Sequence, residues 1–368
     1  MKRPRLPVCL FALTLAVLAF CLFRPSASGY LPPALDEGNA RSLLRIWSIS
    51  SVGGGESWLK ERLRAFEKQH PGVMTYLRSV SPEELELADA VLPDLVLYTP
   101  GTLTAPQELF IPISGAGQLR ESVLRCGRWQ NQQYGLPLCW GGYVLCWDGA
   151  LDPHSAATPA PTTLWGRSPE KTDDSAGQPG FPYEAILAAD TPLLTPSSAG
   201  AFSLCLMPSQ TRLLSLPQEL RSPAEVYSLF RSRACTCAVL TTGQMTAFSA
   251  LTSSGKGFAF GMLVPEQIIT DQVWLGSVIK GAEDTAAPLL LSFLTSPESQ
   301  LKLTEQGLHT VRESTKLYAA GWEAEVESAA GRSLCALNAY VPAADIQAAA
   351  WQVCSGQCGI SEALLPLL

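Results

Sequence analysis

The sequence has little charge, few histidines and none of the common catalytic motifs. Charged residues make up 16% of the 368 residues, and the three histidines are His70, His154 and His309. No GxSxG, HExxH or P-loop pattern occurs, since Gly255-Lys256 lacks the rest of a P-loop. These absences argue against a serine hydrolase, a zinc protease and a P-loop ATPase, and we expect no enzymatic activity. An extracellular glycoside hydrolase stays open, because its two carboxylates can lie far apart in sequence.

The chain also lacks basic runs and metal-ligand spacings. The formal net charge is −7 and the isoelectric point is about 5.2, with no run of lysines or arginines after the first few residues. A nucleic-acid partner is therefore not expected. No CxxC or HxxxH pattern occurs, so we expect neither a metal nor another cofactor.

Cysteine, by contrast, is abundant. Two of the eleven cysteines, Cys9 and Cys21, lie in the N-terminal segment that ends at Gly29, which leaves nine. Because nine is odd, at least one thiol must be free or intermolecular. The close pairs Cys235/Cys237 and Cys354/Cys358 are candidates for disulfides in an exported chain. The simplest interpretation is a set of small buried side chains with one or two bridges.

The N-terminus is typical of an export segment. Lys2, Arg3 and Arg5 precede an apolar run from Leu6 to Phe23, and Ser26-Ala27-Ser28 offers a small-residue cleavage site. The run is also close to the length of a spanning helix. The segment 1–29 is therefore a signal peptide or a membrane anchor. A lipoprotein signal ending at Cys21 ranks third, because Phe20 stands where a small residue is expected. The rest of the chain should lie outside the cytoplasm, extracellular or periplasmic, with the segment 30–43 as a linker.

The remaining length suits about two domains, and the pattern predicts α/β units. Residues 44–49 alternate as in a strand, residues 50–55 form a glycine-rich loop, and a helix begins at Glu56 with Trp58, Leu59, Leu63 and Phe66 on one face. Strands are expected over 73–80 and 95–98, and later over 237–241, 258–264 and 273–279. In such sheets a ligand contacts loops at the carboxyl ends of the strands. Residues 156–180 are expected to be irregular.

The stretch Gln133 to Asp148 is expected to connect two lobes. It contains β-prone residues interrupted by Gly141-Gly142, a pair that marks a bend. We predict that Tyr134 to Pro137 leave the first lobe, that the two glycines lie at the crossing, and that Val144 to Trp147 enter the second lobe.

Several short motifs, taken in order, resemble those of the extracellular solute-binding proteins of ABC importers, the family that includes maltodextrin-binding proteins. They are Arg45-Ile46-Trp47, Gly54-Gly55-Glu56, Trp58-Leu59, Phe66-Glu67-Lys68, His70-Pro71-Gly72, Pro93-Asp94-Leu95-Val96, Tyr134-Gly135-Leu136-Pro137, Phe181-Pro182-Tyr183-Glu184, and Phe293 to Glu298 with Ala287 and Gln300. The resemblance covers most of the exported chain. The sequence departs from the family pattern at the lipobox and between Asp148 and Gly180, where only Pro161-Thr162-Thr163-Leu164-Trp165 resembles the usual segment.

The resemblance implies a two-lobed periplasmic-binding-protein-like (type II) α/β fold, in which each lobe is a β-sheet flanked by helices and hinge crossovers join the lobes. The first lobe would comprise 44–139 and 270–307, and the second would comprise 140–269 and 308–368. The implied function is capture of a small solute, a carbohydrate first, and its delivery to an ABC-type permease by a monomer held at the membrane through its N-terminal segment. A sensor for a membrane receptor is the alternative on the same fold, and an extracellular glycoside hydrolase is a further one.

Aromatic rings and a few polar groups are the expected ligand contacts, since sugars stack on rings and hydrogen-bond through their hydroxyls. For each aromatic the alternative is packing in a core, most of all for Trp58. For Trp140 we make a specific prediction, namely that it lies at the floor or wall of the cleft. The candidate ligand-binding residues are Gly55, Glu56, Trp58, Asp94, Tyr98, Thr99, Trp140, Tyr183, Thr242 and Trp274.

Overall fold

The computed structural model describes residues 42–86, 92–114, 118–151, 182–189, 191–207, 213–282, 285–313 and 315–368. Within these ranges no helix combines the length and apolarity needed to cross a membrane. The expectations for the export segment, for most of the linker and for the irregular stretch 156–180 fall outside the described residues. Residues 42–368 form one compact unit.

Sheet 1 has five strands in the order β2-β1-β3-β13-β6. β1, β2 and β3 are parallel, whereas β13 runs antiparallel to both β3 and β6. β3, β6 and β13 are buried along their whole length, as expected for strands covered on both faces. The strands are β1 Ser42–Ser48, β2 Val73–Ser79, β3 Leu95–Tyr98, β6 Leu136–Trp140 and β13 Val273–Val278.

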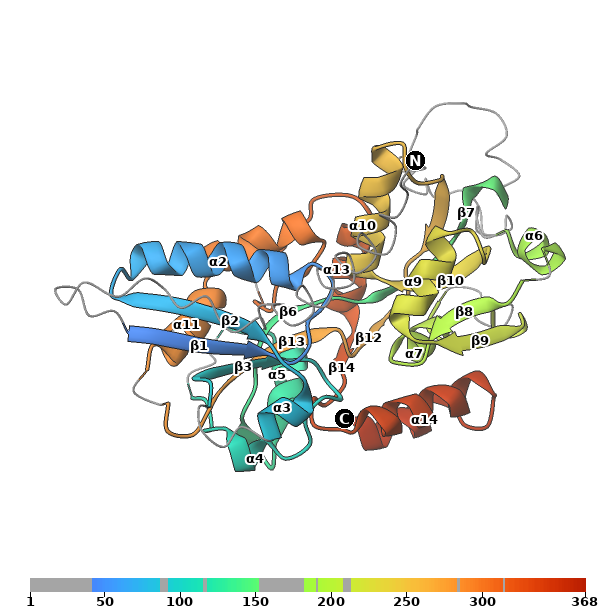
Figure 1. Cartoon of the computed structure of the whole chain (residues 1–368). Helices are drawn as coiled ribbons and strands as arrows, with labels where there is room; N and C mark the ends of the chain where they lie inside the picture. The colour runs from blue at the N-terminus through green and yellow to red at the C-terminus, as the bar shows by residue number, and fades with distance from the viewer. Residues whose placement is uncertain are drawn as a thin grey trace, which may run out of the picture. The chain divides into compact units, whose positions relative to one another are not determined.

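The predicted first helix is present as α2, Gly55–Gln69, which runs alongside β1 and β2 (Figure 1). Its buried face contains Trp58, Leu59, Leu63 and Phe66, as predicted from the helical period of the sequence. The other short elements before β6 and the helices between β13 and residue 307 are α3 Pro82–Glu86, α4 Pro106–Leu109, α5 Glu121–Leu124, η1 Arg125–Gly127, β4 Arg128–Trp129, β5 Gln132–Gln133, α11 Ala287–Leu294, α12 Pro297–Leu301 and η4 Lys302–Gln306.

Sheet 2 has the order β11-β7-β10-β8-β9. β8, β9 and β10 are parallel, and β7 is antiparallel to both β10 and β11. Its strands are β7 Tyr143–Asp148, β8 Leu193–Pro196, β9 Gln218–Arg221, β10 Cys237–Thr241 and β11 Phe260–Leu263. The helices among them are η2 Gly149–Leu151, α6 Tyr183–Ala188, α7 Gly200–Leu204, α9 Pro223–Arg231 and α10 Thr242–Ser253. We refer to sheet 1 with its helices as lobe 1 and to sheet 2 with its helices as lobe 2.

Three crossing segments connect the lobes. The first is Gly141-Gly142 between β6 and β7, so the prediction that this pair marks the crossing is confirmed. The second is Asp271-Gln272 between β12 (Ile268–Thr270) and β13, and the third is 307–321 between η4 and α13 (Trp322–Arg332). The first segment lies between the other two: Gly141 N donates to Gln272 O at 2.7 Å, and Trp140 and His309 form an antiparallel bridge.

The C-terminal region contacts both lobes. β14 (Leu334–Ala336) pairs with β12, while α14 (Ala343–Cys354) contributes buried side chains to the same apolar cluster as Phe202 of α7. Between them, Ala339 N donates to Cys126 O and Ala339 O accepts from Gly101 N. Part of the segment that we assigned to lobe 2 therefore touches lobe 1. The chain ends with α15 Ile360–Leu364 and η5 Leu365–Leu367.

Candidate functional site

The carboxyl ends of β1 and β3 present two hydroxyl groups. Ser50 follows β1 and Thr99 follows β3; their side-chain oxygens lie 2.9 Å apart, and Thr99 N donates to Ser50 Oγ at 2.8 Å. Both residues are half-buried. The Gly53-Gly54 turn leads from this edge to the start of α2, and Gly54 adopts a left-handed φ of 83°. This is the edge at which open α/β sheets hold ligands.

Lobe 2 meets this edge through the start of α10. Thr241 and Gln244 form a capping box there, and Thr242 Oγ1 accepts from Gly142 N at 3.1 Å. A Cβ added to Gly243 would lie 2.6 Å from Gly53 O, so the two lobes touch backbone to backbone. We call the surroundings of this contact, with Ser50, Thr99 and Thr242, the seam. Because two helix N-termini with positive partial charge lie near it, the seam suits electron-rich oxygens of a ligand.

A buried polar cluster lies behind the second crossing segment. Asp271 Oδ1 accepts from the Tyr143 hydroxyl at 2.5 Å, and Oδ2 accepts from Ala199 N at 3.1 Å. The Tyr143 oxygen also lies 2.9 Å from Ser198 Oγ and accepts from Gln272 Nε2 at 3.0 Å. Burial, followed by the Asp271 charge, raises the pKa of Tyr143 well above its ordinary value. The cluster fastens the crossing to lobe 2 and leaves Gln272 half-buried beside Gly141.

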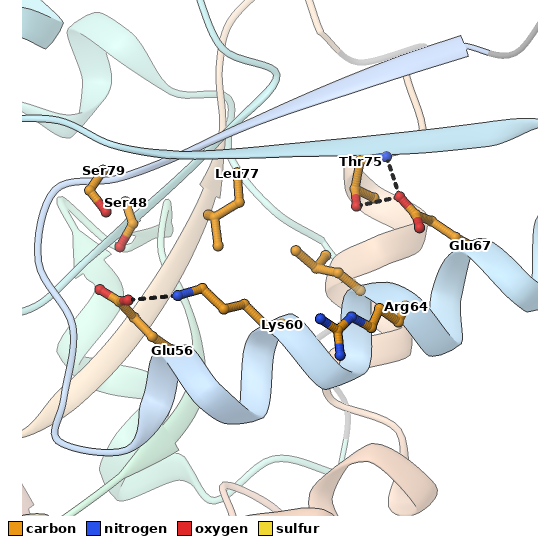
Figure 2. Close-up of a pocket in the computed structure, with 9 residues that line it drawn as sticks. Ser48, Glu56, Lys60, Arg64, Glu67, Thr75, Leu77 and Ser79 are labelled. Carbon is orange, nitrogen blue, oxygen red and sulfur yellow. Dashed lines mark hydrogen bonds and ion pairs between the residues drawn. The ribbon is translucent and has the colours of Figure 1, made fainter. Parts of the chain in front are cut away.

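Two cavities lie on lobe 1 rather than at the seam. One, of about 330 Å³, runs between α2 and β2 (Figure 2), where Glu56 pairs with Lys60 and Glu67 accepts from Thr75. The Thr75 backbone N–H also donates to Glu67, at 2.7 Å, which covers part of the sheet edge. The other, of about 570 Å³, is lined mainly by aliphatic side chains and by Arg312.

Comparison of the fold with solved structures identifies its architecture. The GacH receptor of Streptomyces glaucescens, solved unliganded and with acarbose, matches with a TM-score of 0.58 at 13% identity, over 88% of this chain and 96% of that one. The galacto-N-biose/lacto-N-biose I-binding protein of a Bifidobacterium longum ABC transporter matches at 0.59 and 10% identity, over 90% and 95%. Maltose-bound MalE3 of T. maritima matches at 0.57 and 14% identity, over 88% and 97%.

The chain has the two-lobed fold of the periplasmic binding proteins. No protein-family model matches the sequence, and no curated protein matches it by sequence comparison. The likeness therefore lies in the arrangement of elements, and the predicted fold class is confirmed.

In this binding-protein fold, four of the five predicted aromatic contacts are enclosed by protein. Trp58, Tyr98, Trp140 and Trp274 are each exposed by 1% or less. The indole N–H groups donate to backbone carbonyls: Trp58 to Ser299 O at 3.0 Å, Trp140 to Thr310 O at 2.8 Å and Trp274 to Ser50 O at 2.8 Å. The Tyr98 hydroxyl lies 2.7 Å from that of Ser277, and burial raises the Tyr98 pKa.

These contacts correct the expectation for the rings in this conformation. Each ring fills a core and each polar atom has an internal partner, so none of the four presents a stacking face. Trp140 in particular stacks on His309, with ring centroids 4.5 Å apart, instead of forming a cleft wall. The stack lies where the first and third crossing segments meet, and we call the region of the three crossing segments the hinge. Trp274 comes nearest to the seam, since a Cβ on Gly55 would lie 2.9 Å from its ring.

The remaining predicted residues divide between the seam and other positions. Thr99 and Thr242 lie at the seam, and Gly55 begins α2 beside it. Glu56 points into the α2 groove, where it pairs with Lys60 (Figure 2). Asp94 precedes β3, and its Oδ2 accepts from Arg45 N at 2.6 Å. Asp94 therefore lies at the amino end of that strand, opposite to the carboxyl ends at which open α/β sheets hold ligands.

Tyr183 is half-buried at the start of α6, and its hydroxyl lies 2.8 Å from Ser215 Oγ. Sequence reasoning did not select Ser50, Gly243, Asp271 or Gln272. The polar pair Asp271-Gln272 interrupts two apolar β-prone runs, which is the signal that could have indicated a second crossing.

Cysteine chemistry does not contribute a site in the described part of the chain. All nine cysteines there are free thiols, and six of them are buried. The expected bridges are therefore absent from the described residues. Burial raises the pKa of Cys205 to about 11 and that of Cys235 to about 12, so these thiols are unreactive at neutral pH. No cluster of three or more potential metal-ligating His, Cys, Asp or Glu side chains occurs among the described residues.

Proposed function

We propose that this protein is an extracellular solute-binding protein that captures a small carbohydrate at the seam and delivers it to an ABC-type permease. The observation that carries the proposal is the meeting of the two lobes through Gly53 and Gly243, beside hydroxyl groups at the carboxyl ends of sheet 1. Separation of the lobes about the three crossing segments would open this edge to a solute.

The chemistry of the seam supports a ligand rich in hydroxyl groups. Ser50, Thr99 and Thr242 at the seam, and Gln272 beside Gly141, each carry groups that both donate and accept hydrogen bonds. The similar structures include one with acarbose, one with lacto-N-biose and one with maltose, at identities of 10 to 14%. Binding, rather than turnover, is proposed because the described residues of the seam include no pairing of a nucleophile with a general base.

The proposed assignment of moving parts follows the strands. Sheet 1 with α2, α11 and α12 would move as one body, and sheet 2 with α7, α9 and α10 as the other. We further propose that the protein works as a monomer held at the outer face of the membrane by its N-terminal segment.

A ligand screen tests the proposal. Thermal unfolding of the purified protein is followed with panels of mono- and oligosaccharides, amino acids, polyamines and metal ions, because a ligand that binds only the folded state raises the unfolding temperature. We expect stabilisation by one class of sugar and full recovery of the sugar intact. Stabilisation by non-carbohydrates alone would refute the carbohydrate assignment, and hydrolysis of an oligosaccharide would refute the binding role.

A further inference from the structure

Among the described residues, His309 is the histidine that lies in a crossing segment. Its side chain is completely buried, and the backbone forms a bridge with Trp140, in which His309 N donates to Trp140 O at 2.8 Å and His309 O accepts in return at 3.2 Å. This bridge ties the third crossing segment to the end of β6, next to the first. Any rotation of the lobes must strain or release it.

The imidazole ring is held between two aromatic rings. Trp140 stacks on one face with centroids 4.5 Å apart and an interplanar angle of 24°, and Tyr318 meets the ring edge to face at 5.3 Å. Tyr318 is fixed in turn by its hydroxyl, which donates to Leu308 O at 2.9 Å. Both aromatic rings belong to the hinge, so the imidazole is its packed centre.

Neither ring nitrogen of His309 makes a hydrogen bond to the described residues. The nearest ionisable group is Glu327 of α13, whose Oε1 lies 3.7 Å from Nδ1. Glu327 is already engaged, because it accepts from the backbone N–H groups of Leu317 and Tyr318 at 3.1 to 3.3 Å. Arg120, which donates to Ala330 O, also faces the site and repels a positive imidazole.

We propose that His309 is a proton-sensitive switch in the hinge, which is packed and closed while the imidazole is neutral and loosens when the imidazole gains a proton. The proton would come from the medium and go to a ring nitrogen that makes no hydrogen bond to the described residues in the packed state. Between two rings and beside Arg120, a charged imidazolium cannot be hydrated. Separation of Trp140 from His309 would let water reach the imidazolium again.

The balance of forces around the ring sets the direction of the effect. Burial lowers the His309 pKa and Arg120 lowers it further, while Glu327 raises it, and burial outweighs the carboxylate. The packed hinge therefore binds fewer protons than an opened one. The neutral imidazole therefore stabilises the packed hinge fully above the ordinary pKa of histidine. This stabilisation is lost as the pH falls from that pKa towards the lowered pKa of the packed state. The packed-to-open ratio should fall about tenfold per pH unit within that window.

Hydrogen exchange of the full-length protein tests the switch without any solute, so its outcome is separate from that of the ligand screen. Protection factors are corrected for the intrinsic pH dependence of exchange and measured for peptides covering residues 136–142 and 305–313 at pH 7.5 and pH 5.5. We expect a fall on the order of tenfold in these peptides on acidification. Peptides from β1 and β10 should keep their protection.

Two variants of His309 and one control variant test whether the His309 imidazole is the group that responds to pH. His309→Phe keeps the aromatic stack and His309→Gln keeps polarity, but neither can gain a proton near pH 6. His70→Gln is the matched control, since His70 lies at the end of α2 against Phe66, outside the hinge. The acid-induced loss of protection should vanish in both His309 variants and persist in the control.

Equal hinge protection at the two pH values in the unmodified protein would overturn the proposal. A loss that spreads evenly over both sheets would overturn it too, as would a loss that survives in a folded His309 variant. If neither variant folds, the unmodified protein still decides, because a loss confined to the two hinge peptides supports the switch.

Discussion

At the scale of single residues, the contact between the lobes requires a glycine at position 243. A Cβ on Gly243 would lie 2.6 Å from the carbonyl oxygen of Gly53, whereas a Cβ on Gly53 would lie 3.5 Å from its nearest neighbour, an ordinary contact distance. Real Cβ atoms do not approach oxygen so closely. The same residues have no such conflict when the lobes are apart, so the effect of a side chain there depends on conformation.

Gly243→Ala should weaken ligand binding without unfolding the protein. Alanine favours the α10 helix, but its methyl group resists closure by about 1–3 kcal/mol, which corresponds to a loss of affinity of roughly 5- to 150-fold. Titration calorimetry with the ligand found by screening measures the loss. Gly331→Ala is the matched control, because Gly331 lies in α13 with nothing within 4 Å of an added Cβ. Equal affinities of the two variants would contradict closure at this contact.

Asp94→Ala should affect stability rather than binding. The carboxylate accepts from Arg45 N at 2.6 Å and so joins the loop before β3 to β1. Loss of this charge-assisted bond should lower the free energy of unfolding by about 1–2 kcal/mol. Urea denaturation measures this decrease. Ligand affinity should stay unchanged, since Asp94 lies at the amino end of its strand. A selective loss of affinity would restore Asp94 as a ligand contact.

At the scale of elements, local rules account for the helices that begin with a cap. In α9, Ser222 Oγ accepts from Glu225 N, and the Glu225 carboxylate accepts from Ser222 N, with proline at the first helical position. That box is legible in the sequence Ser-Pro-Ala-Glu. By contrast, α2 begins at Gly55 with no side-chain cap, after a left-handed glycine. The start of α2 therefore lacks the side-chain acceptor that caps α9, and Gly55 N donates to the backbone oxygen of Val52 at 2.9 Å instead.

Ser222→Ala should destabilise lobe 2 through α9 alone. We expect a decrease of about 1 kcal/mol in the free energy of unfolding, the usual cost of removing a serine N-cap. Chemical denaturation measures the decrease. Ser228→Ala, at an exposed position within the same helix, removes the same hydroxyl without touching the cap and should leave stability unchanged or slightly raised. An equal effect of both substitutions would show that the box contributes nothing.

At the scale of the whole molecule, burial decides which groups can react. Burial raises the pKa of the fully buried thiols because the thiolate cannot be hydrated, and it also raises the pKa of the partly covered Cys335 and, to about 12, that of Cys354. Cys358 is also only partly covered. The proposed location outside the cytoplasm would expose the protein to oxidants, and burial separates six of the nine thiols of the described region from them.

Alkylation of the native protein at pH 7.5 should follow that order. Mass spectrometry after a short reaction with iodoacetamide should find label first on Cys358, which is partly exposed, later on Cys335 and Cys354, whose pKa values burial raises, and last on Cys139, Cys146 and Cys237. After unfolding without a reductant, all nine of these thiols should react. A thiol that stays blocked until a reductant is added would reveal a disulfide and contradict the arrangement described.

Much of the fold was predictable from sequence because it rests on local patterns. The helical period placed α2, the apolar runs placed β3, β10 and β13, and Gly141-Gly142 marked the crossing between sheets. The site was less predictable because an aromatic residue on an apolar run can face either a core or a cleft. From the sequence, Trp140 and Trp274 cannot be distinguished from residues that stack on a ligand. Their indole N–H groups, however, donate to the backbone oxygens of Thr310 and Ser50, in distant parts of the chain.

By itself the sequence determined the α/β class, the order of the elements and the crossing at Gly141-Gly142, because periodicity and turn chemistry act over short stretches of chain. Only the tertiary structure decided that Gly53 meets Gly243, that Asp94 lies at the amino end of β3 away from the seam, and that His309 packs between Trp140 and Tyr318. Most of these relations join positions that are far apart in the sequence, and no short-range preference encodes them. They follow from the three crossing segments, which bring both lobes to a common hinge.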